Sequence, residues 1–111
     1  MNIQIFGRSK CFDTKKAQRW FKERRIKFQY IDIDRYGMSR GELQNVCSAV
    51  GGIQSLINEK APGIEELTYL AFEADKFEKM LECPEFIKTP VVRNGKKATV
   101  GCCPEVWETW E

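Results

Sequence analysis

The order of apolar and polar positions along the chain predicts alternating strands and helices. Near the N-terminus, Ile3 and Ile5 fall on one face of a short strand over residues 2–6. Apolar residues then recur at helical spacing over residues 12–25, and alternating apolar residues over 26–33 indicate a second strand. Strand, helix and strand in this order predict a βαβ unit with parallel pairing.

The middle of the chain has helical patterns. Ser39 and Glu42 have the spacing of a capping box, and the helix that follows them should end at Gly51-Gly52. A short buried turn is expected at residues 53–57. Two further helical faces are predicted, over residues 64–71 and 77–81.

The last part of the chain predicts a β-hairpin and a short helix. Asn94-Gly95 is the preferred pair for a type I′ turn, and it separates predicted strands over residues 89–93 and 96–100. Pro104 suits the first position of a final helix. The complete order implies an α/β fold, with a small mixed sheet and helices on both faces.

Length and composition limit the possible classes of protein. A chain of 111 residues has room for one domain. No apolar run approaches the roughly 20 residues needed to span a bilayer, and the first residues do not resemble a signal peptide. We therefore expect one cytoplasmic domain over residues 1–111, with no membrane partner.

The titratable residues narrow the possible chemistry. The chain contains no histidine, which excludes Cys-His nucleophile pairs and His-ligated zinc. Its five cysteines include no Cys-x-x-Cys pair, so no metal site is expected. An odd cysteine count also argues against a disulfide framework. Any reaction should therefore use cysteine, carboxylate, amine or hydroxyl groups.

The charge is unevenly distributed. The net charge is +2, but residues 1–30 hold nine Lys/Arg and two Asp/Glu, whereas residues 31–111 hold nine and fourteen. The cations over residues 15–27 are interpreted as a solvated helix face, with an acidic partner as the alternative. No DNA-reading motif is evident, so no direct nucleic-acid binding is expected.

Cys11 is the candidate nucleophile. It stands where the first strand leads into the first helix, and N–H groups at a helix N-terminus lower the pKa of a thiol. Arg8, Lys10 and Lys15 add positive charge nearby. The alternative is a small buried apolar residue, the role expected of Cys47 on the apolar face of its helix.

Several motifs together resemble the ArsC family, which includes glutaredoxin-dependent arsenate reductases and Spx-type transcription regulators. The motifs, in order, are Phe6-Gly7-x-x-x-Cys11-x-x-x-Lys15-Lys16-Ala17-x-x-Trp20-Phe21, Leu56-Ile57-Asn58, Thr89-Pro90-Val91-Val92, Asn94-Gly95-Lys96 and Val100-Gly101. The resemblance spans essentially the whole chain. It implies a thioredoxin-like fold with an inserted helical segment at about residues 36–86.

The resemblance also implies roles for individual residues. Cys11 matches the nucleophile, and Pro90 matches a cis-proline whose preceding backbone pairs with an extended substrate such as glutathione. The predicted substrate-binding residues are Arg8, Lys10, Lys15, Lys60, Thr89 and Pro90. Cys102, or alternatively Cys103, is predicted to resolve an oxidised Cys11; otherwise both belong only to the turn before the last helix.

The sequence departs from both branches of this family. Arsenate reductases in the family hold the oxyanion with three arginines, and the matching positions here carry Glu59-Lys60, Thr89 and Cys102. Efficient arsenate reduction is therefore not expected. Many Spx-type regulators carry Cys-x-x-Cys at the first motif, and here the second position is Thr14.

Three functional hypotheses follow. The first is a thiol-disulfide oxidoreductase without a bound cofactor, with glutathione or a glutaredoxin- or thioredoxin-type thiol as its partner. The second is a non-catalytic Spx-type regulatory protein that binds RNA polymerase. The third is a family member that keeps the fold but serves an unidentified partner.

Overall fold

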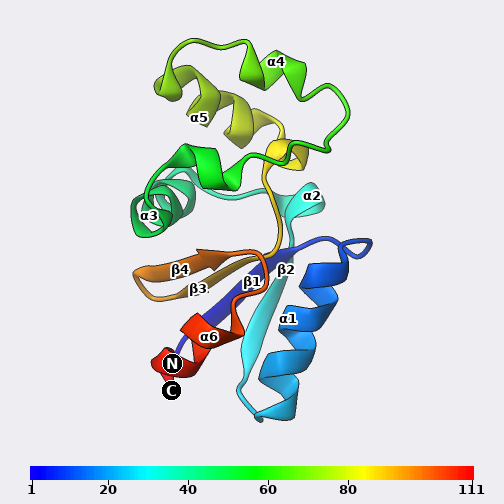
Figure 1. Ribbon diagram of the computed structural model, residues 1–111, viewed down its shortest axis with the longest axis vertical. Helices are drawn as coiled ribbons and strands as arrows, with labels where there is room; N and C mark the ends of the chain where they lie inside the picture. Colours follow the sequence, from blue (N-terminus) through cyan, green and yellow to red (C-terminus); the bar gives the residue numbers. More distant parts are fainter.

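A four-stranded sheet lies at the centre of the computed structural model, which describes all 111 residues (Figure 1). The strands are β1 (Ile3–Gly7), β2 (Phe28–Asp32), β3 (Val91–Asn94) and β4 (Lys97–Val100). The α-helices are α1 (Phe12–Glu23), α2 (Ile33–Tyr36), α3 (Arg40–Val50), α4 (Glu65–Thr68), α5 (Glu73–Glu82) and α6 (Pro104–Trp107). Short 3₁₀ turns occupy Ile53–Leu56 (η1), Pro84–Phe86 (η2) and Glu108–Trp110 (η3).

The sheet topology brings separate parts of the chain to one edge. The strand order is β2-β1-β3-β4, with β1 parallel to β2 and antiparallel to β3. The predicted βαβ unit and mixed sheet are therefore confirmed. Phe6 near the end of β1 pairs with Val91 at the start of β3. This register places the segment before β3 beside the β1–α1 junction, where Cys11 lies.

Each face of the sheet is covered by its own apolar core (Figure 1). On one face, Ile5 packs with residues of α1 and α6, including Phe21 and Trp107. On the other face, Phe6 packs with residues of the helical segment between β2 and β3. Ile5 and Phe6 are neighbours in sequence and both are fully buried, because successive strand residues point to opposite faces. Strand β1 is therefore buried on both of its faces.

The helical segment follows the prediction in part. Ser39 and Glu42 form the predicted capping box, with hydrogen bonds of 2.8 and 3.1 Å, and Gly51 ends α3 at a φ of +86°. The helix predicted over residues 64–71 is wrong in length, since α4 ends at Thr68. Leu67 is the only fully buried residue of that short helix, so little packing supports a longer one. No helix is long and apolar enough to cross a membrane.

The β3–β4 hairpin forms, but its predicted turn is wrong. Asn94 pairs with Lys97, so the two central residues are Gly95 and Lys96 rather than Asn94 and Gly95. Gly95 has a φ of +62°, and a glycine at the first central position is typical of a type II′ turn. Asn94 stays in the strand because it pairs with Ile3 of β1.

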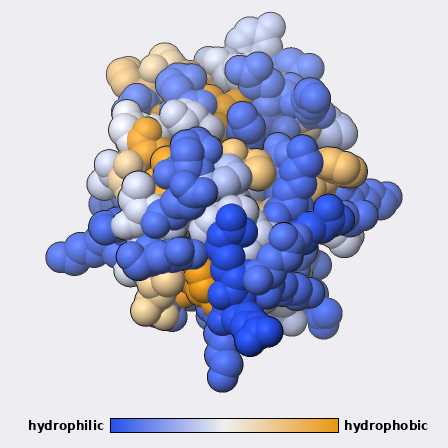
Figure 2. Space-filling view, turned by 60° about the horizontal axis from the view of Figure 1, so that its bottom comes forward, coloured by the Kyte–Doolittle hydropathy of each residue, from blue (hydrophilic) through white to orange (hydrophobic).

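The end of the molecule that carries α1 and α6 is strongly hydrophilic on its surface (Figure 2). Thr14, Ala17 and Phe21 bury one face of α1, while the lysines and arginines of the opposite face are exposed. The predicted solvated face of this helix is therefore confirmed. Its binding to an acidic partner stays a prediction.

Candidate active site around Cys11

Cys11 occupies the N-cap position of α1, as the sequence predicts, with φ −84° and ψ 117°. Its N–H donates to the Arg8 carbonyl at 3.1 Å, and its own carbonyl accepts from Lys15 at 3.3 Å. The Cys11 sulfur lies at the start of the helix, where the N–H groups of Asp13 and Thr14 help to lower the pKa of its thiol. First-turn N–H groups have no partner within the helix, so they are available to stabilise an anion.

Burial raises the pKa of the Cys11 thiol more than any other single influence. Hydrogen bonds from the hydroxyls of Thr14 and Thr89, and from the N–H groups of Thr14 and Asp13, lower it. Together these donors outweigh burial, so the pKa of Cys11 lies below its ordinary value. The site therefore favours the thiolate, which is the nucleophilic form of cysteine.

Thr14 supports the thiolate, a role that the sequence analysis missed. Its side chain is buried, and its hydroxyl also accepts from the Arg8 N–H at 3.4 Å. A Cβ at Gly7 would lie 2.3 Å from Thr14 Cγ2, so only glycine at this position lets Thr14 pack there. The available signal was a hydroxyl residue three positions after a helix-capping cysteine. The sequence also offers Asp13 or Thr14 as the cap of this helix, whereas the structure places Cys11 at the N-cap.

Thr89 and Pro90 lie beside Cys11, and the peptide bond between them is cis, as the resemblance implies. The Cys11 thiol donates to the Thr89 carbonyl at a sulfur–oxygen distance of 3.5 Å. The Thr89 N–H has no hydrogen-bond partner in the protein. Thr89 therefore offers a backbone donor to a ligand next to the sulfur.

Cys11 opens into a cleft of about 690 Å³. The cleft is lined by the β1–α1 junction, by η1 with the loop after it, and by the two residues before Pro90: Arg8, Lys10, Cys11, Asp13, Gln54, Ser55, Ile57, Asn58, Glu59, Lys60, Lys88 and Thr89. Four of these side chains are cations and two are anions. None of the three lysines forms an ion pair, in contrast to Arg8, which pairs with Asp34. The cleft therefore suits an anionic ligand.

Three residues predicted for the site do not line this cleft: Lys15, Pro90 and Cys102. Lys15 is exposed on α1. Cys102 packs against the core beneath α1 and α6, and burial followed by the charge of Asp13 raises the pKa of its thiol. The Cys103 thiol donates to the Val100 carbonyl at 3.4 Å, and all five cysteines are unpaired. Resolution of Cys11 by Cys102 or Cys103 stays a prediction.

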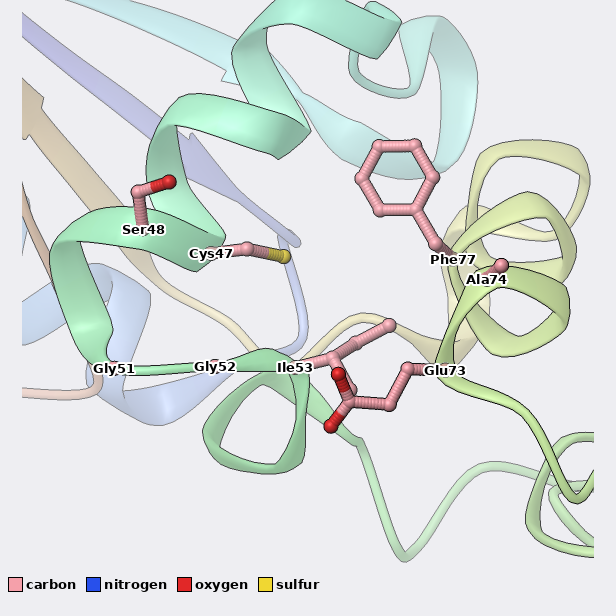
Figure 3. Close-up of a pocket in the computed structure, with 8 residues that line it drawn as sticks. All are labelled: Cys47, Ser48, Gly51, Gly52, Ile53, Glu73, Ala74 and Phe77. Atoms are coloured by element: carbon pink, nitrogen blue, oxygen red, sulfur yellow. The ribbon is translucent and has the colours of Figure 1, made fainter.

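A second hollow, of about 440 Å³, lies between the end of α3 and the start of α5. Figure 3 shows the Cys47 sulfur and the Phe77 ring projecting between these helices, with the Glu73 carboxylate beside Ile53. Burial, and then the charge of Glu73, raises the pKa of the Cys47 thiol. Cys47 packs against the core but is only partly buried, so its predicted core role holds in part. This hollow lacks the donors that stabilise a thiolate at Cys11.

Comparison with known proteins yields consistent matches. A family model described as the ArsC family matches residues 6–110. The global transcriptional regulator Spx 2 of Oceanobacillus iheyensis is 30% identical over 106 residues, which cover 91% of this chain and 77% of that protein. An ArsC-family-related protein from Bacteroides fragilis has a TM-score of 0.87 at 20% identity, covering 100% and 98% of the two chains. An arsenate reductase from Vibrio cholerae has a TM-score of 0.84 at 22% identity, covering 96% and 94%. These two structures show the thioredoxin-like fold.

Proposed function

Because this chain belongs to the ArsC family, we propose that it is a thiol-disulfide oxidoreductase with Cys11 as its nucleophile. One observation carries the proposal: the Cys11 thiol, with its lowered pKa, opens into a cleft whose lysines are unpaired. A thiolate at neutral pH is the attacking species in disulfide exchange. An anionic disulfide would be drawn to the same cleft.

The proposed reaction has two exchange steps. The Cys11 thiolate attacks one sulfur of a disulfide R–S–S–R, forms the mixed disulfide Cys11–S–S–R, and releases R–S⁻, which takes a proton from water. A second thiol, as its thiolate, then attacks the R sulfur of the mixed disulfide, displaces the Cys11 thiolate, and forms a new disulfide with R. The second thiol is glutathione or a glutaredoxin- or thioredoxin-type protein. Each turnover breaks one disulfide, releases one R–SH and forms one new disulfide between R and the second thiol, so no bound cofactor is needed. If Cys102 resolves the adduct instead, it attacks the Cys11 sulfur, forms a Cys11–Cys102 disulfide and releases R–S⁻, and two external thiols then reduce that disulfide and are joined in a new one.

Glutathione is the proposed small-molecule partner. It is an extended, anionic peptide, and the free Thr89 N–H together with the Thr89 carbonyl offers it backbone pairing beside the sulfur. Lys10, Lys60 and Lys88 are placed to attract its carboxylates. Lys15 would act only through its charge, since it lies outside the cleft lining.

Arsenate is a poor substrate under this proposal. Two of the three positions where the resemblance implies arginine line the cleft, and they carry Lys60 and Thr89. A lysine supplies a point charge rather than a bidentate fork, and threonine supplies no charge. The third position carries Cys102, which does not line the cleft. We therefore expect turnover of glutathione mixed disulfides to exceed turnover of arsenate.

Reduction of a glutathionylated peptide, measured beside a Cys11→Ser variant, tests the proposal. Cys47→Ser is the matched control because Cys47 lies in the other hollow and has a raised thiol pKa. We expect Cys11→Ser to abolish turnover and Cys47→Ser to preserve it. Lys60→Gln and Lys88→Gln should raise KM for the anionic peptide adduct more than for an uncharged disulfide. An ordinary Cys11 pKa together with no thiol-dependent turnover would refute the oxidoreductase.

A second candidate function rests on the relative named as a transcriptional regulator, at 30% identity. In this alternative the chain is a non-catalytic, Spx-type partner of RNA polymerase in the cytoplasm, without direct contact to nucleic acid. The helical segment over residues 36–86 would be the family's insertion into the thioredoxin-like fold. Capture of purified RNA polymerase that persists in Cys11→Ser, in a chain without turnover, would favour this alternative.

A further inference from the structure

Arg8 is the one arginine in the cleft, and its side chain is directed at the protein rather than at the open space. Its side chain is 15% exposed. Nε lies 2.9 and 3.0 Å from the two carboxylate oxygens of Asp34. Nη1 donates to the Ile87 carbonyl at 2.7 Å and to Thr89 Oγ1 at 3.2 Å, and Nη2 donates to the Pro84 carbonyl at 2.6 Å.

These contacts leave little of the guanidinium for a ligand. Arginine has five N–H donors, and the contacts to Asp34, Ile87, Thr89 and Pro84 use four of them. A bidentate grip on an anion needs two parallel N–H donors. Arg8 therefore cannot hold an oxyanion or a carboxylate bidentately without breaking bonds to its own protein.

The contact to Thr89 affects the nucleophile. A threonine hydroxyl has one hydrogen to donate, and its position is set by the acceptors around it. Arg8 donates to Thr89 Oγ1, and it also occupies the carbonyls of Ile87 and Pro84. Arg8 therefore holds the side chain of the residue whose carbonyl lies 3.5 Å from the Cys11 sulfur, and the Thr89 hydroxyl is one of the groups that lower the pKa of the Cys11 thiol. The guanidinium itself makes no hydrogen bond to that sulfur.

We propose that Arg8 is a positioning residue, which holds Thr89 beside the Cys11 sulfur and fastens the segment before β3 to the end of β1. The proposal rests on Cys11 being the nucleophile, as proposed above. It replaces the prediction from the sequence that Arg8 binds substrate. Asp34 anchors Arg8 from α2, so it belongs to the same arrangement.

The pH dependence of Cys11 alkylation by iodoacetamide, followed on the Cys11 peptide by mass spectrometry, tests this role without any substrate. Arg8→Lys keeps the charge but loses the fork, and Thr89→Val removes the hydroxyl while keeping the shape. Each change should lower the alkylation rate at pH 7 roughly three- to tenfold, because one donor to the thiolate is lost. At high pH the rates should converge with those of the wild type.

The double variant Arg8→Lys/Thr89→Val separates positioning from direct action. If Arg8 acts through Thr89, the double variant should be no slower than Thr89→Val alone. Thr89→Ser should restore most of the rate, since it restores the hydroxyl. Arg40→Lys is the matched control, because Arg40 pairs with Glu78 on the helical segment and does not line the cleft. It should leave the alkylation profile unchanged.

Several results would overturn the proposal. Equal losses from Arg8→Lys in the wild-type and Thr89→Val backgrounds would show that Arg8 does not act through Thr89. An unchanged pH profile with a raised KM for the peptide adduct would make Arg8 a substrate ligand. If Arg8→Lys does not fold, Asp34→Asn replaces it and should lower the Cys11 alkylation rate at pH 7 by a smaller factor. An unchanged rate in Asp34→Asn would then contradict the proposal. An ordinary wild-type alkylation profile would instead refute the proposed function itself.

Discussion

Replacing Gly7 by alanine tests the closest packing in the site. The added Cβ would lie 2.3 Å from Thr14 Cγ2, 2.8 Å from Thr14 Oγ1 and 3.1 Å from Thr14 Cβ. Thr14 is buried in the first turn of α1, and its clashing atoms include the β carbon, so it cannot move aside cheaply. We expect the start of α1 to shift away from the end of β1.

We expect Gly7→Ala to lower the free energy of unfolding, because the new methyl group overpacks a buried position. Inserting a methyl group into a well-packed interior typically costs about 1–3 kcal/mol. The reduced entropy of the unfolded chain offsets this by roughly 0.4–1 kcal/mol. The net effect should lower the melting temperature by several degrees, at about 4 °C per kcal/mol for a domain of this size. Since Thr14 helps to lower the pKa of the Cys11 thiol, Cys11 alkylation at pH 7 should also slow.

Gly41→Ala provides the matched control, because it makes the same chemical change in open space. A Cβ at Gly41 would meet no atom within 4 Å, and Gly41 lies on the exposed face of α3. Alanine there should stabilise the protein by up to about 1 kcal/mol through helix propensity. Thermal denaturation and site-resolved alkylation of both variants give the two readouts.

The double variant Gly7→Ala/Thr14→Ser removes the methyl group at 2.3 Å and keeps a hydroxyl for Cys11. It should recover part of the stability that Gly7→Ala loses. If Gly7→Ala were instead as stable as Gly41→Ala, with an unchanged alkylation rate, the close packing of Gly7 against Thr14 would be wrong. Thr14 would then not contribute to the lowered pKa of the Cys11 thiol.

Three further changes have definite expected outcomes. Thr99→Val should lower the free energy of unfolding, measured in urea, by about 1–3 kcal/mol. The buried Trp107 Nε1–H donates to Thr99 Oγ1 at 2.8 Å and would lose this partner. Ser39→Ala should lower the free energy of unfolding by about 1 kcal/mol, because it removes the N-cap of α3. Its control, Ser48→Ala at an exposed position of the same helix, should change that free energy by less than about 0.5 kcal/mol. The lowered pKa of Cys11 in the folded protein stabilises the fold above the unfolded thiol pKa, and this contribution is lost as pH falls through the folded pKa. The stability difference between wild type and Cys11→Ser should therefore grow as pH rises toward about 8.5, and a constant difference would contradict the shift.

The elements that could be predicted from the sequence are those with strong local signals. The capping box of α3 needs only Ser39 and Glu42 at the right spacing, and both hydrogen bonds form. The helix predicted over residues 64–71 is wrong in length because only Leu67 is fully buried there, with Ile64 partly buried against the same core, so little tertiary packing supports its C-terminal half. The hairpin turn failed because pairing of Asn94 with β1 outweighs the preference of Asn-Gly for the turn centre.

The residues of the candidate site also divide into those that the sequence indicates and those that only the fold reveals. Cys11 was identified from its place at a strand-to-helix junction, and the cis bond before Pro90 from the family resemblance. The spacing of Thr14 three positions after Cys11 is a local signal, but only the close approach of α1 to Gly7 shows that the Thr14 side chain is buried at the site. The positive charge of Arg8 predicts a substrate ligand, whereas its partners, 26 to 81 residues away along the chain, are visible only in the fold and support the positioning role proposed above.

The sequence by itself determined the nature of the chemistry. A chain without histidine and with a cysteine at a helix start must form its thiolate from backbone N–H groups, hydroxyls or nearby cations. Only the tertiary structure decided among these. The antiparallel pairing of β3 with β1 brings Thr89 to Cys11, and the close packing at Gly7 brings Thr14, so hydroxyls and N–H groups lower the pKa. Hydrogen bonds depend on distances of a few ångströms between residues far apart in sequence, and only the folded chain sets those distances.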